Sequence, residues 1–380
     1  MQNDRVKIFI IAGEVSGDVL GGRIMREFQN AEFFGVGGEN MISAGLNSLF
    51  PMSDLSVMGI FEVLGHARTL TNRIRQTADA ILKEKPDIVL TIDSPSFAKA
   101  VIKKVKKSPI GQDLINKGMR FHHVVAPQVW AWREKRAKKY ADTFDKLYAF
   151  FDFEVPYFTK YGLDTVAVGH PIADGLLNFR KNDKIEEKII TLVPGSRMSE
   201  VKRLLPVFQD VAKRLVANGY IGYKFVIPTV ETTVDYIREQ TKNWEVKPEL
   251  VPASERYNVY SKTYIAIVAS GTVSAELAML HIPTIVVYKM NPVTTWFARR
   301  MINIKWVSLI NILLNRTLFP EFLGSDATAE NILDAIQQMT IPSVRKKMIS
   351  DLQKADCLWY RSEGSPSALI ADNVKKAIKK

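Results

Sequence analysis

Short β-branched runs alternate with helical patterns along the chain, and this alternation restricts the fold more than any other feature. Each apolar run closes at a glycine, a proline or a polar turn, as strands do. Strands separated by helices pair in parallel, because a parallel connection needs a crossover of a dozen or more residues. The sequence therefore predicts an α/β fold with parallel sheets. The strands are expected within residues 6–13, 87–94, 120–127, 146–151, 188–196, 223–228, 264–271 and 283–289.

The length of the chain predicts two domains, because 380 residues exceed what one hydrophobic core usually supports. Residues 176–188 are polar and charged without an apolar period, which is typical of a linker. We expect an N-terminal domain over residues 1–178 and a C-terminal domain over residues 179–342. Helices within about 343–380 are expected to pack back on the first domain. Ligands are expected at the carboxyl ends of the strands, in a cleft between the domains.

The charge balance favours an anionic partner, because 52 Lys and Arg stand against 40 Asp and Glu. The cations are scattered and no nucleic-acid-binding motif occurs, so a nucleic-acid-binding protein is the less favoured interpretation. A single cysteine, Cys357, excludes an internal disulfide and fits a reducing cytosol. No apolar stretch reaches the length of a membrane span, and the first apolar run meets Glu14 too early for a signal peptide. Any membrane contact is therefore expected to be peripheral.

Two strand-to-helix turns in the second half predict a phosphate site. The stretch LVPGSRMSEVKRL ends a strand at Gly195 and Ser196 and places Arg197 at the start of a helix. Free backbone N–H groups, the positive helix end and a guanidinium suit a phosphate or diphosphate. An ordinary capped helix with a solvated arginine is the alternative. A second such turn occurs at Ser270, Gly271 and Thr272.

Two carboxylates stand beside these turns as candidates for acid-base chemistry and ribose binding. Asp93 ends a strand of the first half in LTIDSPSF, where it could accept a proton from a hydroxyl, or serve only as a turn or helix-cap residue. Glu276 follows the second phosphate turn and could bind a ribose diol, or simply complement the helix dipole. His122 and His123 point to opposite faces of a strand, and no metal-binding or cofactor motif occurs. We expect neither a metal nor a cofactor.

Nine ordered motifs resemble those of the lipid-A-disaccharide synthase family, which are two-domain glycosyltransferases of the GT-B type. The resemblance implies two Rossmann-like domains with parallel sheets facing a central cleft. The motifs are AGEVSGD at 12–18, GVGGENM at 35–41, SVMGIFEVLG at 56–65, IDSPSF at 92–97, APQVWAWREKR at 126–136, VGHPIAD at 168–174, LVPGSR at 192–197, ASGTVSAELAML at 269–280 and VSLINILLNR at 307–316.

The resemblance implies a specific reaction. UDP-2,3-diacylglucosamine would condense with 2,3-diacylglucosamine 1-phosphate to give the β-1,6-linked lipid A disaccharide phosphate and UDP, with inversion. Asp93 would be the general base, Arg197 would neutralise the leaving diphosphate with help from residues 270–272, and Glu276 would hold the ribose. Asn311 and Glu321 match positions at the nucleotide side.

Two departures from the family pattern change the expected contacts. Gly324 stands where the family usually has glutamine, which puts one donor contact in doubt. Ser96 replaces a second acid of the usual IDAPDF pattern. That replacement removes the rival to Asp93 as the essential carboxylate.

The stretch APQVWAWREKR is expected at the acceptor side of the cleft. One ring of Trp130 or Trp132 would pack beneath the acceptor, while Arg133 and Arg136 would lie near its phosphate or anionic lipid. Aromatic packing beside a solvated helix is the alternative. Cations within residues 99–107 and 299–305 would suit an anionic leaflet, or form solvated faces. The other acceptor-side candidates are Gly13, Glu14, Ser16, Gly17, Asp18, Met58 and Gly59.

Other interpretations stay open at this point. A UDP-N-acetylglucosamine epimerase or a cell-wall glycosyltransferase would share the phosphate-binding turns. The sequence also leaves a homodimer open. The resemblance implies a cytoplasmic protein, peripherally associated with the cytoplasmic face of the inner membrane.

Overall fold

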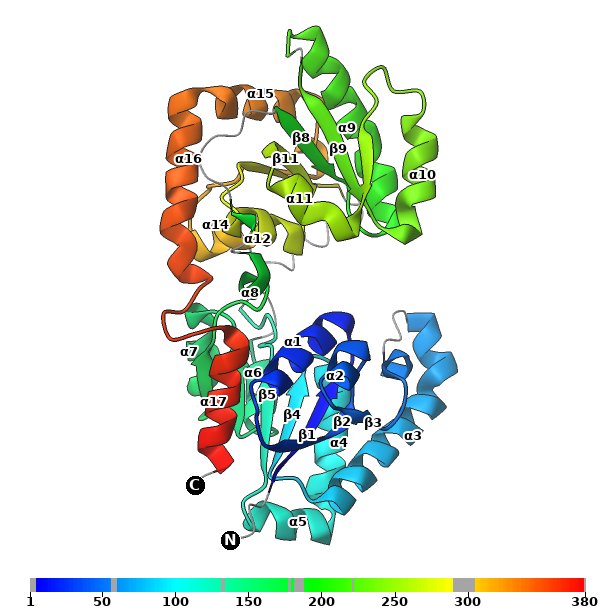
Figure 1. The fold of residues 1–380 in the computed structure, drawn as a ribbon, viewed down its shortest axis with the longest axis vertical. Helices are drawn as coiled ribbons and strands as arrows, with labels where there is room; N and C mark the ends of the chain where they lie inside the picture. Colours follow the sequence, from blue (N-terminus) through cyan, green and yellow to red (C-terminus); the bar gives the residue numbers. More distant parts are fainter. Residues whose placement is uncertain are drawn as a thin grey trace. The chain divides into compact units, whose positions relative to one another are not determined.

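The computed structural model describes residues 5–55, 60–130, 134–176, 179–180, 188–220, 222–289 and 305–378, with only the backbone for 60–67 and 174. The chain divides into two compact units (Figure 1). Unit 1 comprises Met1–Pro171 and Tyr360–Lys380, and unit 2 comprises Ile172–Trp359. The chain crosses between the units seven residues before the expected boundary at 178, and crosses back after Trp359.

Unit 1 is built on a parallel seven-stranded sheet in its described part, with the order β3-β2-β1-β4-β5-β6-β7. All five residues of β4 are buried, as expected for a strand covered by helices on both faces. The strands are β1 (Val6–Ala12), β2 (Ala31–Val36), β3 (Asn47–Ser48), β4 (Ile88–Ile92), β5 (Arg120–Val124), β6 (Lys146–Ala149) and β7 (Asp164–Ala167). The helices are α1 (Val15–Arg26), α2 (Glu39–Ser43), α3 (Ile60–Glu84), α4 (Pro95–Lys107), α5 (Pro109–Asn116), α6 (Arg136–Ala141), α7 (Val155–Thr159) and α17 (Pro366–Ile378).

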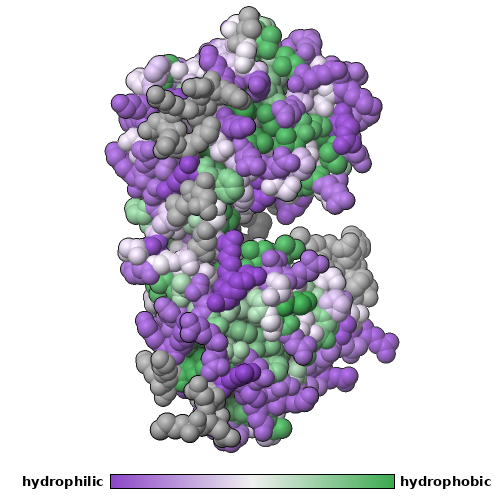
Figure 2. All heavy atoms as spheres, viewed as in Figure 1, coloured by the Kyte–Doolittle hydropathy of each residue, from purple (hydrophilic) through white to green (hydrophobic). Residues whose placement is uncertain are grey.

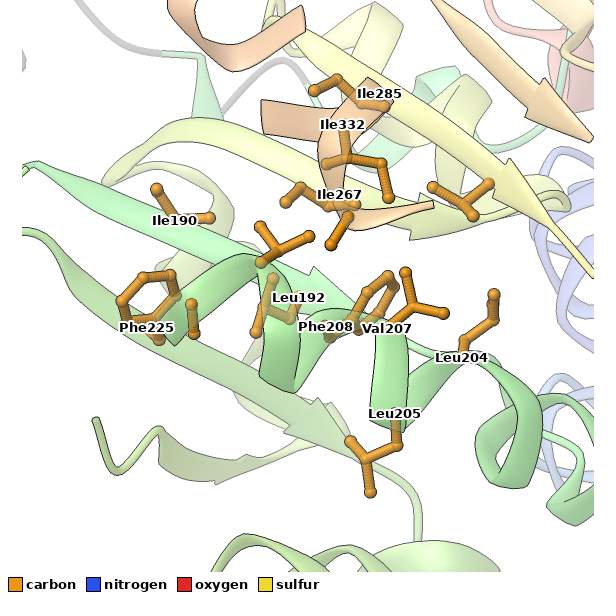
Figure 3. Packing of buried hydrophobic residues seen from close by; sticks show 14 of the residues in the cluster. Ile190, Leu192, Leu204, Leu205, Val207, Phe208, Phe225, Ile267, Ile285 and Ile332 are labelled. Atoms are coloured by element: carbon orange, nitrogen blue, oxygen red, sulfur yellow. The ribbon is translucent and has the colours of Figure 1, made fainter. Parts of the chain in front are cut away.

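Unit 2 repeats this plan with a six-stranded parallel sheet in its described part, ordered β10-β9-β8-β11-β12-β13. Figure 3 shows its core, where Phe208 of α9 packs among strand residues such as Leu192 and Ile267. The strands are β8 (Ile189–Val193), β9 (Lys224–Thr229), β10 (Glu249–Pro252), β11 (Thr263–Ala269), β12 (Thr284–Tyr288) and β13 (Glu321–Leu323). The helices are α8 (Ala173–Leu176), α9 (Met198–Ala217), α10 (Glu231–Thr241), α11 (Arg256–Tyr260), α12 (Thr272–Met279), α14 (Leu309–Leu314), α15 (Ala329–Thr340) and α16 (Pro342–Lys354).

Alternate residues of the unit 1 strands feed two separate cores. Phe9 and Val89 contribute to one hydrophobic cluster, whereas Ile8 and Leu90 contribute to another. The helix α17 joins the second cluster through apolar residues such as Ile370 and packs against α1. Period-2 alternation therefore places helices on both faces of the sheet. The predicted parallel α/β architecture is confirmed.

The last helices do not stay together, contrary to the expectation that 343–380 would return to the first domain. Only α17 packs in unit 1, while α16 packs against α15 in unit 2. The guanidinium of Arg345 in α16 lies 3.7 Å from the Tyr264 ring centroid, and its Nη1 donates to the Tyr264 carbonyl at 2.7 Å. Arg316 also pairs with Asp351 of α16 at 3.0 Å. These contacts hold α16 in unit 2.

Hydrophilic side chains predominate over the visible face of each unit, and hydrophobic areas are interspersed among these side chains (Figure 2). Within the described ranges, no helix is both long enough and apolar enough to span a bilayer.

The order of strands places one topological switch point in each sheet. In unit 1 the chain moves outward from β1 through β2 to β3, and then in the opposite direction from β4. In unit 2 the reversal falls between β8 and β11. Ligands of open parallel sheets bind outside the carboxyl ends of the strands at such points. The residues after β1, β4, β8 and β11 are therefore the first place to look for a site.

Candidate active site

The turns after β1 and β4 touch one another in unit 1. Gly13 follows β1 directly, and a Cβ atom at this position would lie 2.2 Å from the Oγ atom of Ser94. No side chain fits such a gap, so glycine at 13 permits the close approach of the two turns. A Cβ atom at Gly17, in the first turn of α1, would lie 3.4 Å from side-chain atoms of Ala12 and Ile92. The start of the helix therefore packs closely on the sheet.

The backbone at the ends of β4 and β5 is strained. Asp93, Ser94 and Val125 have φ angles of 55°, 44° and 82°, which non-glycine residues seldom adopt. Each costs about 1–3 kcal/mol, and such strain persists where the surrounding structure enforces it, commonly at functional sites. Here the Asp93 and Val125 N–H groups donate to the carbonyls of Val124 and Tyr148 at 3.1 Å. Oδ1 of Asp93 accepts from the Ser94 N–H at 2.8 Å.

A second carboxylate shares this edge of the unit 1 sheet. Glu14 is the exposed N-cap residue of α1. Partial burial raises its pKa, and so does the nearby charge of Asp93. Two carboxylates in electrostatic contact suit proton transfer, because a like charge makes a carboxylate more basic. The neighbouring Ser16 is exposed beside them.

Asp18 has a structural environment, unlike Glu14 and Ser16 of the same motif, which are exposed. Its side chain is only 2% exposed. Its two oxygens accept from the backbone N–H groups of Gly38, Asn40 and Met41 at 2.8–3.0 Å, and from the Asn40 amide at 2.8 Å. These bonds fix the start of α2, where the GVGGENM motif lies. They use the carboxylate within the fold and leave it no evident capacity for a substrate.

Trp130 packs inside unit 1 beside a glutamate that the sequence interpretation missed. The Trp130 ring lies edge-on to Phe153, with centroids 5.4 Å apart. Glu154 is 5% exposed, and its Oε2 accepts from the N–H groups of Phe150 and Phe151 at 3.2 and 3.1 Å. Burial raises the pKa of Glu154 to about 7, against the opposing effect of these bonds and of the Trp130 indole. The sequence signal for Glu154 is its place in FDFEVP, just after a predicted strand. That stretch is otherwise typical of a loop.

Four of the acceptor-side candidates, Met58, Gly59, Trp132 and Arg133, lie outside the described residues. Arg136, the remaining member of that set, begins α6 and is half-buried. Its charge lies within electrostatic reach of Lys99 and Tyr140.

In unit 2, the turn after β8 presents a guanidinium at a helix start. Gly195 has a φ angle of 109°, and a Cβ there would lie 2.4 Å from Oε2 of Glu200. Arg197 is the N-cap residue of α9, and its side chain is 72% exposed. Its Nη1 donates to Oε1 of Glu200 at 3.1 Å. Ser196, between them, is exposed.

The turn after the neighbouring strand β11 is open. Gly271 precedes α12, and an added Cβ would meet no atom within 4 Å. Gly271 and Thr272 are exposed, and Ser270 is half-buried. Adjacent parallel strands thus carry two helix N-termini, those of α9 and α12. Their free N–H groups and helix dipoles favour an anion.

Glu276 lies one turn inside α12, and one of its carboxylate oxygens, Oε2, accepts no hydrogen bond in the described structure. It is 7% exposed, and its Oε1 accepts from the Tyr257 hydroxyl at 3.2 Å. Arg256 Nε lies 3.5 Å from Oε2. Within the described structure, Oε2 makes no hydrogen bond although it is buried. Burial raises the pKa of Glu276, while Arg256 opposes the rise. Arg256 and Tyr257 were not anticipated, because only the fold brings them to this helix.

Asn311 and Glu321 bond to each other and to their own loop. Asn311 Nδ2 donates to Glu321 Oε1 at 2.7 Å and to the Phe319 carbonyl at 2.8 Å, while its Oδ1 accepts from two backbone N–H groups. Glu321 also accepts from the N–H groups of Val307 and Ser308 at 2.8 and 2.9 Å. These bonds hold the start of α14, and they engage every polar group of the fully buried Asn311 side chain.

Gly324 directly follows β13 and has a φ angle of 63°. This left-handed conformation is one that glycine adopts without strain. The departure from the family pattern at 324 therefore coincides with a turn that glycine suits.

Comparison with known proteins shows the family. The family model described as lipid-A-disaccharide synthetase matches residues 8–360. The lipid-A-disaccharide synthase of Rhodospirillum centenum is 37% identical, over 98% of this chain and 95% of the relative. That of Rickettsia canadensis is 36% identical, over 97% of each chain.

Solved structures show the fold alone, since their sequence identity is low. A putative UDP-N-acetylglucosamine 2-epimerase from Listeria monocytogenes has a TM-score of 0.65 at 13% identity, covering 99% of this chain and 96% of that one. The calicheamicin glycosyltransferase CalG4 has a TM-score of 0.63 at 13% identity, covering 100% and 99%. These neighbours confirm the predicted GT-B fold class. The family match over most of the length goes further: the chain belongs to the lipid-A-disaccharide synthase family, glycosyltransferases of lipid A biosynthesis.

Proposed function

We propose that this chain transfers the 2,3-diacylglucosaminyl group of UDP-2,3-diacylglucosamine to the 6-hydroxyl of 2,3-diacylglucosamine 1-phosphate, with inversion and release of UDP. The observation that carries the proposal is the chemistry of the two switch points. One presents Asp93 in a strained turn with the carboxylate of Glu14 nearby, and the other presents a guanidinium with two helix N-termini. The first suits proton removal and the second suits a diphosphate leaving group.

The donor would bind to unit 2 through its nucleotide. Its diphosphate would lie at the N-termini of α9 and α12, against the N–H groups of Gly195, Ser196 and residues 270–272. Arg197 is exposed there and would neutralise the charge that develops as UDP departs. The buried Oε2 of Glu276 would accept from the ribose diol. Asn311 and Glu321 would support this site by shaping the loop before α14.

The acceptor would bind to unit 1, where Asp93 accepts the proton of its primary hydroxyl. The oxygen then attacks the anomeric carbon of the donor from the face opposite UDP. The new C–O bond forms as the bond to the β-phosphate oxygen breaks, and both electrons leave with UDP. Glu14 would bind a hydroxyl of the acceptor. The glycines at 13 and 17, together with Ser16, would give the sugar close access to backbone.

The acyl chains of both substrates imply contact with a lipid surface. Val15 is 70% exposed beside Glu14, although valine is usually buried. We propose that the protein is cytoplasmic and binds peripherally to the anionic cytoplasmic face of the inner membrane. The acceptor-side roles of Trp130 and Arg136, and of Met58, Gly59, Trp132 and Arg133, stay predictions.

The decisive experiment incubates the protein with the UDP-linked diacylglucosamine, with and without the diacylglucosamine phosphate. We expect UDP release and a β-linked disaccharide phosphate only when both substrates are present, which chromatography and mass spectrometry would detect. Epimerisation or UDP release at the same rate without acceptor would contradict the transferase. It would instead favour an epimerase with the same fold.

A further inference from the structure

A lysine of α4 in unit 1 lies on the ring of a buried tyrosine in α6, and two cations of α6 act on its charge. The Nζ atom of Lys99, in the second turn of α4, lies 4.7 Å from the Tyr140 ring centroid in α6. Lys99 is half-buried, and its pKa is lowered first by burial and then by the charges of Arg136 and Lys139. The positive charges of Arg136 and Lys139 repel that of Lys99. In the described part of the chain, neither Lys99 nor Lys139 pairs with a carboxylate.

Two buried polar atoms next to these cations also lack partners within the described residues. They are Tyr140 Oη and His123 Nε2, in side chains that are 0% exposed. The two rings are 5.6 Å apart, and Nδ1 of His123 is engaged with Thr91 Oγ1 at 2.6 Å. Buried polar groups are nearly always satisfied in folded proteins, so unsatisfied ones call for a ligand or ordered water.

The same tyrosine connects the cations to the strained turn. Burial raises the pKa of Tyr140, with a further rise from Asp93, while Arg136 opposes it. Asp93 and Arg136 therefore both lie within electrostatic reach of one phenol. Along α4, Lys99 stands about 6 Å from Pro95, at about 1.5 Å per residue over four residues. The cation cluster is thus a short distance from the proposed base.

We propose that Lys99, Arg136 and Lys139 bind the phosphate of the sugar acceptor, with Lys99 as the central residue. The inference rests on the proposed function, and it names the residues that recognise the acceptor. The phosphate on C1 and the reacting hydroxyl on C6 belong to the same sugar, and their ring carbons lie on either side of the ring oxygen. A site for the first must therefore lie about one sugar from Asp93. A bound phosphate dianion would also relieve the repulsion among the three cations.

The same cations could instead bind anionic lipid head groups. The other lysines of α4 help to distinguish lipid binding from binding of the acceptor phosphate. Lys103 and Lys107 are exposed, whereas Lys99 is half-buried against a ring. Lys106 is taken up by the carbonyls of Asp142 and Thr143, at 3.4 and 2.8 Å. Lys99 and Lys106 are both half-buried beside α6, but in the described structure only Lys106 donates to carbonyls there, which leaves the charge of Lys99 for a ligand.

The test compares Lys99→Gln and Lys139→Gln with the matched controls Lys103→Gln and Lys107→Gln. Initial rates are measured in neutral detergent micelles, with the acceptor and with the same diacylglucosamine lacking its phosphate. We expect Lys99→Gln to raise the KM for the phosphorylated acceptor roughly 10- to 100-fold, as for loss of a charged hydrogen bond. The KM for the phosphate-free acceptor and for the donor should not change. Lys139→Gln should have a smaller effect of the same kind, and the controls none.

Three results would overturn the inference. An unchanged KM for the phosphorylated acceptor is the first, and an equal loss with both acceptors is the second. The third is a loss confined to binding of phosphatidylglycerol vesicles, which would assign the cations to lipid head groups. Lys99→Arg retains the charge and should restore the preference for the phosphorylated acceptor, which separates phosphate binding from packing on Tyr140. Absence of disaccharide with the unmodified protein would instead refute the proposed function.

Discussion

The switch-point turns of the two units occupy corresponding places in their sheets, but they differ in charge and in backbone strain. In unit 1, Asp93 and Ser94 adopt left-handed conformations without being glycine, and Glu14 lies across from them. In unit 2 a glycine, Gly195, takes the left-handed position, and a cation follows it at Arg197. One turn is acidic and strained, and the other is basic and relaxed.

The difference teaches how one architecture serves two tasks. A strained backbone can orient a side chain in a direction that a relaxed turn would not give. The surrounding structure maintains this conformation at a cost of about 1–3 kcal/mol per residue. Binding a diphosphate needs free N–H groups and positive charge, which helix N-termini provide without strain. The strained, destabilising backbone is therefore in unit 1, at the sheet edge where we propose that proton transfer occurs.

Replacing Asp93 tests the acidic side and should have the largest effect. Asn keeps the size of the side chain and tolerates a positive φ angle, so Asp93→Asn should fold normally. Without a proton acceptor, we expect kcat to fall by about 10²- to 10⁴-fold while affinity for UDP is retained. Steady-state rates and calorimetric titration with UDP would measure both. Ser96→Ala, three residues further along in the first turn of α4, is the control. An Asp93→Asn enzyme within threefold of the unmodified rate would refute the role as base.

Replacing Arg197 tests the basic side. Arg197→Gln removes the charge that would stabilise the departing diphosphate, and we expect kcat to fall by about 10²- to 10³-fold. Affinity for UDP should also fall, in contrast to Asp93→Asn. Arg203→Gln, an exposed change on the same helix, should leave both unchanged. If UDP affinity were the same in Arg197→Gln and the unmodified protein, the distinction between the two edges would lose its support.

Acidification should act unequally on the stability of the two units. Burial lowers the pKa of His122 to about 4 and of His123 to about 3, both in β5 of unit 1. These histidines are neutral when folded, so the unfolded chain binds more protons below its ordinary pKa of about 6.5. Their stabilisation is complete above that pH and is lost as the pH falls to about 4 for His122 and to about 3 for His123, at about 1.4 kcal/mol for each unit of pKa difference.

Two carboxyl groups in the described part of unit 1, Glu14 and Glu154, have the opposite sign, because their pKa is raised. The pKa of Glu154 is raised to about 7, so its contribution falls as the pH rises from about 4.5 to about 7 and offsets part of the histidine effect. Hydrogen exchange at about pH 7 and about pH 5 would compare the strands. We expect amides of β5 to lose protection and those of β11 to retain it. Equal loss in both strands would show that the buried histidines do not set the difference.

Much of the fold could be predicted because the signals are local. Strand and helix periods appear within short windows, and parallel pairing follows from the lengths of the crossovers. The positions of Gly13, Asp93, Gly195, Arg197 and Gly271 in strand-to-helix turns could be predicted for the same reason, and their roles stay predictions.

The partners of side chains could not be predicted. Asp18 bonds to the start of α2 some 20 residues away, and Asn311 and Glu321 bond to each other, which leaves these three in supporting environments. The pairing of Glu276 with Tyr257 and the placement of Lys99 on Tyr140 also depend on helices that meet only in the folded chain. The packing of α16 in unit 2 depends on the contact of Arg345 with Tyr264, 81 residues earlier in the chain.

The sequence by itself therefore determined the parallel α/β class, the order of the motifs and the turns where chemistry can occur. These depend on residue periods and on the special backbone freedom of glycine and proline. Only the tertiary structure decided which carboxylates are exposed and which accept hydrogen bonds within the fold, because burial and hydrogen-bond partners arise from segments distant in the chain. A charge becomes a binding group or a structural one according to what packs against it.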